Sequence, residues 1–273
     1  MNIVKLKNQV EKAVARASFN LRPDVKKLLK RAYRFEKNTR ARKALGWILE
    51  NARIAEKEKL AICQDTGLPI IFIEAGKDVN LSGRLIREIE KAVESGYRKN
   101  CLRPSSTEPL IRKASYQGVI FHVEFSNAKG LWITIFPKGF GSENKSQLKM
   151  FKPTVSIAEI EEFVVSAAKE AGPESCPPFI VGVGIGGTSD KALLLAKKAL
   201  IGKVDRPNSD KVLNGLEKRL FKKINSLNIG PMGFSGKTTC LSVKVKKAPT
   251  HIAGLPVGVN ISCHALRSAT IKV

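Results

Sequence analysis

An apolar strand that runs into glycines and then directly into a helix constrains the fold of this chain more than any other segment. Residues 179–187 read FIVGVGIGG, and the residues after them have apolar positions at helical spacing. This order predicts a buried strand, a tight turn and a helix whose N-terminal N–H groups are open to an anion. Because Gly182, Gly184 and Gly187 also satisfy G-x-G-x-x-G, an NAD-dependent oxidoreductase is one alternative for the function.

The rest of the chain mixes helical patterns with short strand patterns, which is typical of an α+β fold. We expect a single compact domain over residues 1–273, with a helical N-terminal part and a mixed or antiparallel sheet flanked by helices. Residues 118–125 and 131–136 are expected to pair as a hairpin, and residues 137–144 to form an exposed loop. Helices are expected over residues 8–19, 23–36, 39–56, 81–97, 156–171 and 209–225, and further strands within residues 61–76 and over residues 241–247.

The charge of the chain is strongly positive. Its 48 Lys and Arg residues against 24 Asp and Glu residues give a net charge of +24, while 43% of the residues are hydrophobic, which excludes a disordered basic tail. The excess fits a nucleic acid, an anionic substrate or an acidic partner subunit, or a surface bias without a specific role. Because no RNP signature and no zinc-finger spacing is present, nucleic acid is not an expected partner, although a basic nucleic-acid-binding protein remains a second alternative.

No apolar run reaches the roughly 18 residues that a membrane-spanning helix needs. The first residues, MNIVKLKNQVEKAV, are amphipathic and lack the apolar stretch of a secretory signal. We therefore expect a cytoplasmic protein without a membrane partner.

Five cysteines with wide spacings argue against a disulfide framework and for reduced thiols. Cys63, Cys176 and Cys263 each stand in or beside a loop, but no CxxC pair is present, so their spacing alone does not identify a metal site. On the residues alone, each can be a buried side chain, a metal ligand or a nucleophile. Polar side chains that can bind a substrate, Gln64 and Asp65, directly follow the first cysteine.

Six motifs occur in a fixed order and together resemble one family. The chain is similar to the α subunit, or N-terminal domain, of class I fumarate hydratases and of the related L-tartrate dehydratases. The similarity extends from about residue 38 to residue 267. The motifs are ICQDTGLPIIFIEAG, NCLRPSSTEPL, PKGFGSENKS, GVGIGGTSDKALLLAKKAL, NIGPMGFSGKTTCLSVKV and THIAGLPVGVNISCHALR.

The resemblance implies a 4Fe-4S cluster held by three cysteines, with one iron left open as a Lewis acid. The ligands match Cys63, Cys176 and Cys263, which leaves Cys101 and Cys240 as ordinary buried thiols. It further implies catalytic roles for Asp65 and His251 and substrate contacts for Gln64, Arg103 and Gly141. An arginine suits a dicarboxylate because its planar fork can hold a carboxylate with two charge-assisted bonds.

The resemblance also implies a reaction and a partner. The expected reaction is the reversible hydration of fumarate to malate, a step of the tricarboxylic acid cycle, with the dehydration of L-tartrate to oxaloacetate as the next candidate. Nothing in the chain is similar to the C-terminal domain that carries the base in this family, so a separate β subunit and an α2β2 assembly are implied. Phe140 stands where the family has a glycine in PKGGGSEN, a departure that can reshape the substrate pocket.

Overall fold

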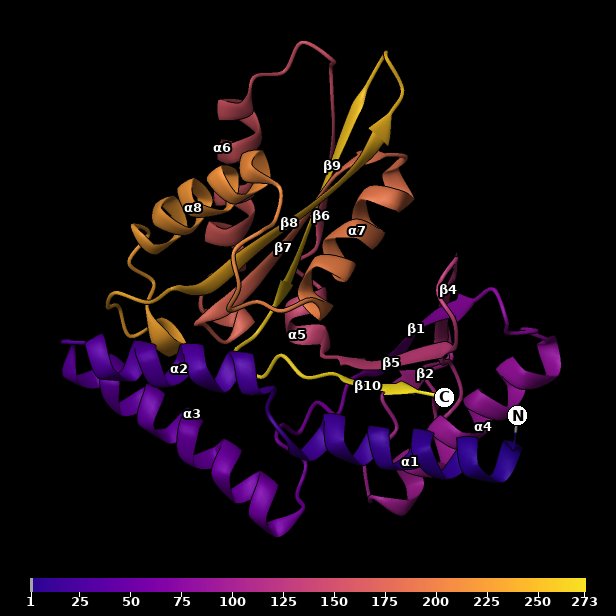
Figure 1. The fold of residues 1–273 in the computed structure, drawn as a ribbon. Coiled ribbons are helices and arrows are strands. Elements are labelled where there is room, and N and C mark those ends of the chain that lie inside the picture. Colours follow the sequence, from indigo (N-terminus) through magenta and orange to yellow (C-terminus); the bar gives the residue numbers. More distant parts are fainter. Residues whose placement is uncertain (1) are drawn as a thin grey trace. The chain divides into compact units, whose positions relative to one another are not determined.

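The computed structural model describes residues 2–273, in which the chain forms two compact units, each with its own sheet and its own apolar core (Figure 1). Unit 1 comprises residues 2–22, 51–140 and 267–273, and unit 2 comprises residues 23–50 and 141–266. The α+β class and the mixed sheets flanked by helices are confirmed. The single domain over residues 1–273 stays a prediction; the residues within it group into two units because the two sheets bury separate sets of side chains.

Unit 1 is built on a four-stranded sheet with the strand order β10-β5-β1-β4. Strand β1 runs parallel to β4 and antiparallel to β5, and the last strand of the chain, β10, pairs with β5 at the edge. The elements of this unit are α1 (Ile3–Phe19), β1 (Leu68–Gly76), α4 (Gly83–Lys99), β2 (Ser106–Thr107), β3 (Ala114–Ser115), β4 (Ile120–Ser126), β5 (Leu131–Lys138) and β10 (Ala269–Lys272), together with the C-terminal part of α3 (Thr39–Glu58).

The expected hairpin between β4 and β5 is wrong, although both strands exist. Strand β1 lies between them and pairs with both, with Ile70 opposite Ile120 on one side and opposite Phe136 on the other. The reason is burial, since eight of its nine residues are buried or half-buried and a strand of this kind belongs in the centre of a sheet. Local alternation and a short connection cannot reveal such an inserted strand.

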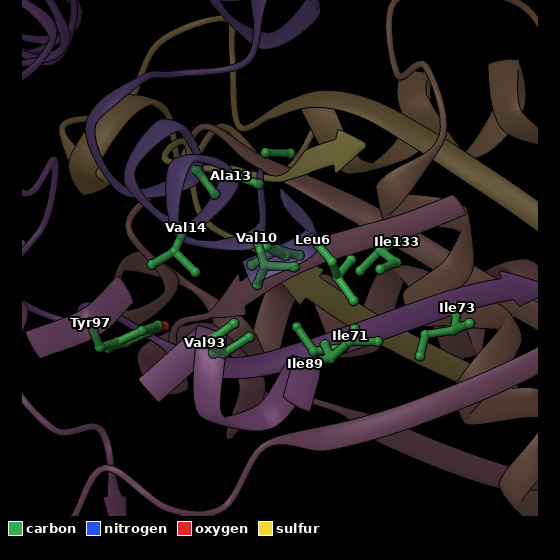
Figure 2. Packing of buried hydrophobic residues seen from close by; sticks show 14 of the residues in the cluster. Leu6, Val10, Ala13, Val14, Ile71, Ile73, Ile89, Val93, Tyr97 and Ile133 are labelled. Atoms are coloured by element: carbon green, nitrogen blue, oxygen red, sulfur yellow. The ribbon is translucent and has the colours of Figure 1, made fainter. Parts of the chain in front are cut away.

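The core of unit 1 lies between this sheet and two helices. Leu6, Val10 and Val14 of α1 meet Ile89 and Val93 of α4, and both helices cover the same face of the sheet (Figure 2). These positions recur at three- and four-residue intervals, so each helix presents one apolar stripe to the strands.

Unit 2 contains a second four-stranded sheet with the order β6-β9-β7-β8. Helix α7 covers one face, and α6 and α8 cover the other (Figure 1). Its elements are α2 (Pro23–Phe35), the N-terminal part of α3, α5 (Phe140–Glu143), β6 (Gln147–Phe151), α6 (Ile157–Ala171), η1 (Pro173–Ser175), β7 (Phe179–Gly187), α7 (Ser189–Ile201), α8 (Lys211–Asn225), η2 (Pro231–Gly233), β8 (Cys240–Thr250) and β9 (Leu255–Ser262).

The strand, turn and helix expected from the glycine motif are confirmed, and the structure gives its first two glycines a packing role. A Cβ at Gly182 would lie 2.1 Å from the Ala196 carbonyl oxygen, and one at Gly184 would lie 2.0 Å from the Ala192 carbonyl oxygen. Helix α7 therefore rests directly on the backbone of β7. Gly187 has a φ of +73°, which also favours glycine. Close helix–strand contact at Gly182 and Gly184 and the positive φ of Gly187 thus account for all three glycines.

The segment expected to be an exposed loop, residues 137–144, is largely structured. Strand β5 continues to Lys138, whose side chain is 1% exposed, and α5 follows with a buried Ser142. Glu143 accepts hydrogen bonds from Lys197 and from Asn260 Nδ2 (2.7 Å for the asparagine). Because these partners stand far along the sequence, local composition could not predict the burial. Within residues 2–273, no helix is both long and apolar enough to cross a membrane.

The buried carboxylate of Glu161 in α6 pairs with two cations of α8 and predicts a pH-dependent stability. Glu161 is 4% exposed and contacts Arg219 Nε at 2.6 Å and Lys223 Nζ at 2.8 Å. Burial alone would raise the pKa of this carboxyl, but the hydrogen bonds from Lys223 and Arg219 and their positive charges outweigh burial and lower it. A carboxyl whose pKa is lowered on folding stabilises the protein above its unfolded pKa, and this contribution is lost as the pH falls through the folded pKa.

We expect Glu161→Gln to lower the free energy of unfolding at pH 7 by about 1–2 kcal/mol, since both cations are about half exposed and partly screened. Below about pH 4 the difference from the parent protein should shrink. Urea unfolding at pH 7 and pH 3.5 measures this. The adjacent Glu162 is exposed, so Glu162→Gln is the matched control. An equal effect of both substitutions at pH 7 would contradict the assignment.

Candidate active site

The CQDTG loop precedes β1 and is fixed by hydrogen bonds from several elements of unit 1. The Tyr97 hydroxyl of α4 donates to the Gly67 carbonyl oxygen at 2.8 Å, and Thr66 Oγ1 donates to the Arg103 carbonyl oxygen at 2.9 Å. Burial raises the pKa of Tyr97, so this hydroxyl stays protonated and acts as a donor. Gly67 has a φ of +85°, and a Cβ there would lie 2.6 Å from the Pro137 carbonyl carbon. The loop therefore has one arrangement, set by α4 and β5.

The Asp65 carboxylate is the centre of this arrangement. Its Oδ1 accepts a hydrogen bond from the Gly67 N–H at 3.0 Å, and its Oδ2 accepts one from the Phe140 N–H at 2.7 Å. Arg267 donates to the Asp65 carbonyl oxygen. A Cβ at position 139 would come within 3.1 Å of Asp65 Oδ2, so the glycine of the PKGFG motif makes room for the carboxylate. Two acceptor sites are thus occupied, and a carboxylate has about four.

A cavity of about 920 Å³ opens beside Asp65 within unit 1. It brings Asp65 and Arg103 together, as the sequence motifs predicted, and Arg103 is exposed there. Phe140, which the motif analysis had singled out, also lines it, together with three residues that the analysis did not select, namely Ser105, Arg112 and Lys113. The lining carries three cationic side chains and two carboxylates, Asp65 and Glu108, so its net charge is +1 and its cations can attract an anionic group. Gln64 is exposed next to Asp65 but is not part of this lining.

Replacement of Asp65 by asparagine tests its anchoring role. One of the two backbone N–H groups would then face an NH₂ group instead of an oxygen, so we expect the free energy of unfolding to fall by about 1–3 kcal/mol. Thermal unfolding of the purified chain measures this. Gln64→Ala is the control next in sequence and should change stability by less than about 0.5 kcal/mol. An unchanged melting temperature for Asp65→Asn would show that the two N–H contacts contribute little.

Two of the three candidate ligand cysteines lie together in unit 2. Cys176 precedes β7 and Cys263 follows β9, and these ends meet because Ile180 pairs with Ser262 in the antiparallel ladder. The backbone N–H of His264 donates to the Cys176 carbonyl oxygen at 3.4 Å, and its ring Nδ1 lies 2.9 Å from the same oxygen. Burial lowers the pKa of His264, so the ring is neutral and Nδ1–H is the donor. Both thiols are half-buried.

The donor set suits an iron–sulfur cluster, because thiolates are the usual protein ligands of such clusters. Beside Cys176, the Ser175 hydroxyl is buried and has no hydrogen-bond partner among the described residues, an orphan that fits a group bound next to it. The third candidate, Cys63, is half-buried and belongs to unit 1. Among the described residues 2–273, no three His, Cys, Asp or Glu side chains of one unit lie close enough together to hold a metal ion.

The other predicted site residues of unit 2 have different surroundings. Gly141 is exposed in α5, and a Cβ there would lie 3.9 Å from the Glu174 carbonyl oxygen, in the segment that leads to Cys176. His251 is exposed before β9, and its Nδ1 accepts a hydrogen bond from the Ala253 N–H at 3.1 Å. Since β9 has eight residues, His251 and Cys263 stand at opposite ends of a strand roughly 25 Å long. Unit 2 does not bring this histidine to the two cysteines.

The motif analysis expected the two remaining cysteines to be buried, and this is correct for Cys240 but wrong for Cys101. Cys240 is fully buried, and burial raises the pKa of its thiol to about 12, so it is inert. Cys101 is exposed instead, because α4 ends just before it and the backbone turns there with a φ of +52°. No disulfide links any of the five cysteines, all of which lie within the described residues.

Comparison with known proteins places these motifs in one family. The model of the family described as "Fumarate hydratase (Fumerase)" matches residues 7–272. The chain belongs to the fumarate hydratase family. Fumarate hydratases and their dehydratase relatives are hydro-lyases, so this chain is a member of a hydro-lyase family, as the six motifs predicted.

Individual members of the fumarate hydratase family match almost the whole chain. A putative L(+)-tartrate dehydratase subunit alpha of Methanocaldococcus jannaschii is 41% identical over 99% of this chain and 98% of its own length. The L(+)-tartrate dehydratase subunit alpha of Escherichia coli K12 is 26% identical over 98% of this chain and 91% of its own length. A putative class I fumarate hydratase of Geobacillus stearothermophilus is 29% identical, in a match that covers 98% of this chain but 55% of that protein.

Proposed function

We propose that this chain is the α subunit of an iron–sulfur-dependent hydro-lyase that acts on a four-carbon dicarboxylate. The observation that carries the proposal is the cavity of unit 1, which is lined by Arg103 and by Asp65, itself held by two backbone N–H groups. Hydration of fumarate to malate is the first candidate reaction, in line with the family description. Dehydration of L-tartrate to oxaloacetate is the second, favoured by the name of the 41% identical relative.

The proposed ligands of a 4Fe-4S cluster are Cys63, Cys176 and Cys263. With three thiolates as ligands, such a cluster has one iron free to act as a Lewis acid toward the substrate oxygens. The half-buried thiols and the orphaned Ser175 hydroxyl support this assignment. The neutral His264 ring fixes the backbone that carries Cys176.

The residues of the cavity have separate proposed roles. Arg103 would hold one substrate carboxylate with two charge-assisted bonds, and Arg112 or Lys113 would attract the other. Asp65 would accept a hydrogen bond from the substrate hydroxyl, because both its oxygens keep free acceptor sites. Gln64 of the CQDTG loop and Gly141 of α5 are proposed as further substrate contacts. Phe140, 44% exposed at the cavity, would limit the size of the substrate.

His251 requires a different arrangement in this proposal. His251 is exposed and lies at the opposite end of β9 from Cys263. We propose that it acts in the active site of a second copy of the chain. An α2β2 assembly provides such a copy. The names of two relatives as "subunit alpha" support a separate β subunit as the partner.

Anaerobic purification of the chain together with a candidate β subunit from the same organism tests the proposal. After reconstitution with iron and sulfide, malate dehydration and L-tartrate dehydration are assayed with the complex and with this chain alone. We expect a cluster in the protein and activity in the complex only. A complex that carries no cluster, or that acts on neither compound, would refute the proposal, and the ratio of the two rates identifies the substrate.

A further inference from the structure

A second cavity, of about 490 Å³, lies entirely within unit 2 and is not part of the site described above. It is formed by the C-terminal part of α7, the segment between α7 and α8, and the middle of β8. Its lining includes six cationic side chains and neither an aspartate nor a glutamate. The six are Lys198, Lys203, Arg206, Lys244, Lys246 and Lys247.

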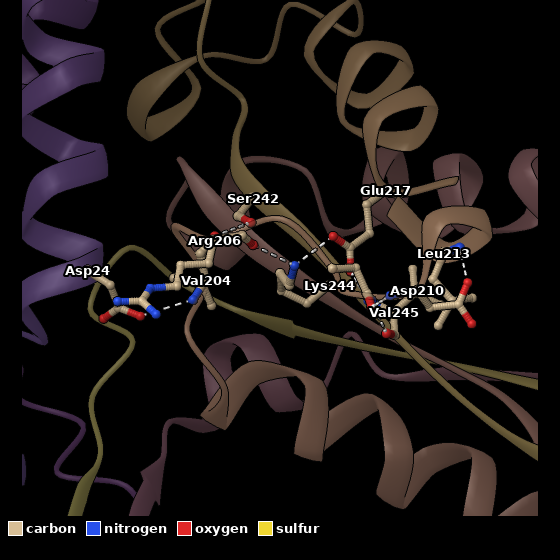
Figure 3. A network of polar contacts seen from close by, with 10 residues as sticks. Asp24, Val204, Arg206, Asp210, Leu213, Glu217, Ser242, Lys244 and Val245 are labelled. Atoms are coloured by element: carbon tan, nitrogen blue, oxygen red, sulfur yellow. Dashed lines mark hydrogen bonds and ion pairs between the residues drawn. The ribbon is translucent and has the colours of Figure 1, made fainter. Parts of the chain in front are cut away.

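A buried polar network makes one wall of this cavity rigid (Figure 3). Lys244, 9% exposed, donates to Glu217 Oε2 at 2.6 Å and to the Arg206 carbonyl oxygen at 3.0 Å. Glu217 Oε1 in turn accepts from the Val245 N–H at 2.9 Å and from Asn208 Nδ2 at 2.8 Å. Strand β8, α8 and the segment that carries Arg206 are therefore held together before any ligand arrives, which reduces the entropy cost of binding.

The same segment is anchored on its other side. The Val204 N–H donates to Asp24 Oδ2 at 3.0 Å, and the Val204 carbonyl oxygen accepts from Ser242 Oγ at 2.7 Å (Figure 3). Both backbone groups of Val204 are thus occupied, one by α2 and one by β8. The backbone between Lys203 and Arg206 cannot shift without breaking these bonds, so the two side chains project from a fixed frame.

Three of the six cations are uncompensated. Lys244 is paired with Glu217, Lys247 is paired with Asp210 at 2.5 Å, and Lys198 also has a partner. Lys203, Arg206 and Lys246 form no side-chain ion pair or hydrogen bond within residues 2–273. Unpaired cations around one concavity repel one another, and an anion bound among them would remove this repulsion.

We propose that this cavity binds a small molecule through two adjacent phosphate groups. A diphosphate carries several negative charges over a short distance, which matches three unpaired cations better than a single carboxylate does. No aromatic side chain lines the cavity, so the phosphates, and not a stacked base, are the recognised part. The volume lies in the range of cavities that hold small molecules of nucleotide size.

Isothermal titration calorimetry of the full chain at about 0.15 M salt tests the proposal, with pyrophosphate and inorganic phosphate as probes. We expect saturable binding of pyrophosphate, at least about tenfold tighter than that of phosphate, because the second phosphate adds charge-assisted contacts. The combined variant Lys203→Gln, Arg206→Gln, Lys246→Gln should bind pyrophosphate at least about 30-fold more weakly. All three side chains are exposed, and circular dichroism checks that the fold is kept.

The control carries the same loss of charge elsewhere in unit 2. Arg40, Lys218 and Lys222 are exposed and do not line the cavity, so Arg40→Gln, Lys218→Gln, Lys222→Gln should bind pyrophosphate within about twofold of the parent chain. Equal weakening in both triple variants would show a general charge effect and overturn the proposal. The absence of saturable binding, or equal affinity for both probes, would also overturn it. These results do not depend on the cluster or on hydro-lyase activity.

Discussion

Cys176→Ser or Cys263→Ser is expected to leave the reconstituted complex with little iron or sulfide and with activity reduced at least about 1,000-fold. Each substitution removes a thiolate from one end of the β7–β9 pair, and a serine hydroxyl is a much poorer ligand for iron. The fold should be kept, because both side chains are half-buried and of similar size to serine. Iron and acid-labile sulfide content, measured before activity, report the cluster directly.

Cys101→Ser is the matched control for this series. Its side chain is exposed after α4, so the same atomic change should leave cluster content and activity as in the parent complex. Cys63→Ser is expected to behave like the two unit 2 variants. If Cys176→Ser or Cys263→Ser retained a full cluster, or if Cys101→Ser lost it, the assignment of ligands would be wrong while the family membership would stand.

The second large effect concerns stability. Gly184→Ala is expected to lower the free energy of unfolding by about 3 kcal/mol or more, because its Cβ would lie 2.0 Å from the Ala192 carbonyl oxygen and 2.7 Å from the Ala196 nitrogen. These are backbone atoms of α7, so no side chain can rotate away and the helix itself must move. Urea unfolding followed by circular dichroism measures the loss.

Gly215→Ala provides the comparison. Gly215 lies inside α8, and the atom nearest to its added Cβ would be the flexible end of Arg219 at 3.5 Å. Alanine is favoured over glycine in a helix, so this substitution should stabilise the chain by about 0.5–1 kcal/mol. A loss of similar size in both variants would mean that close packing of α7 on β7 is not the cause of the destabilisation at Gly184.

Much of the fold could be predicted from local patterns. Helical periodicity placed α1 to α4 and α6 to α8 within a few residues, and the glycine motif placed β7 and α7. The failures share a physical cause, which is contact between distant segments. The insertion of β1 between β4 and β5, the burial of Lys138 and the strands β9 and β10 all depend on partners far along the chain.

The candidate site divides in the same way. Asp65 and Arg103 were selected from motifs, and the structure places both at one cavity. Arg267 and the N–H group of Phe140 were missed, because their role is to hold Asp65 through the backbone and no side-chain chemistry marks it. The CHALR motif contains Arg267, but the hydrogen bond from Arg267 to the Asp65 backbone can be seen only in the folded structure. The positions of Cys101 and His251 likewise depend on where an element ends.

The order of synthesis has a consequence for Asp65. Arg267, which holds the Asp65 backbone, and β10, which completes the sheet of unit 1, are made after all of unit 2. At ordinary ribosomal rates the 126 residues from 141 to 266 take on the order of 10 s to add. Unit 2 can thus fold on the ribosome before the CQDTG loop has its hydrogen bond from Arg267. We therefore expect the Asp65 loop to reach its final arrangement only after Arg267 has been synthesised.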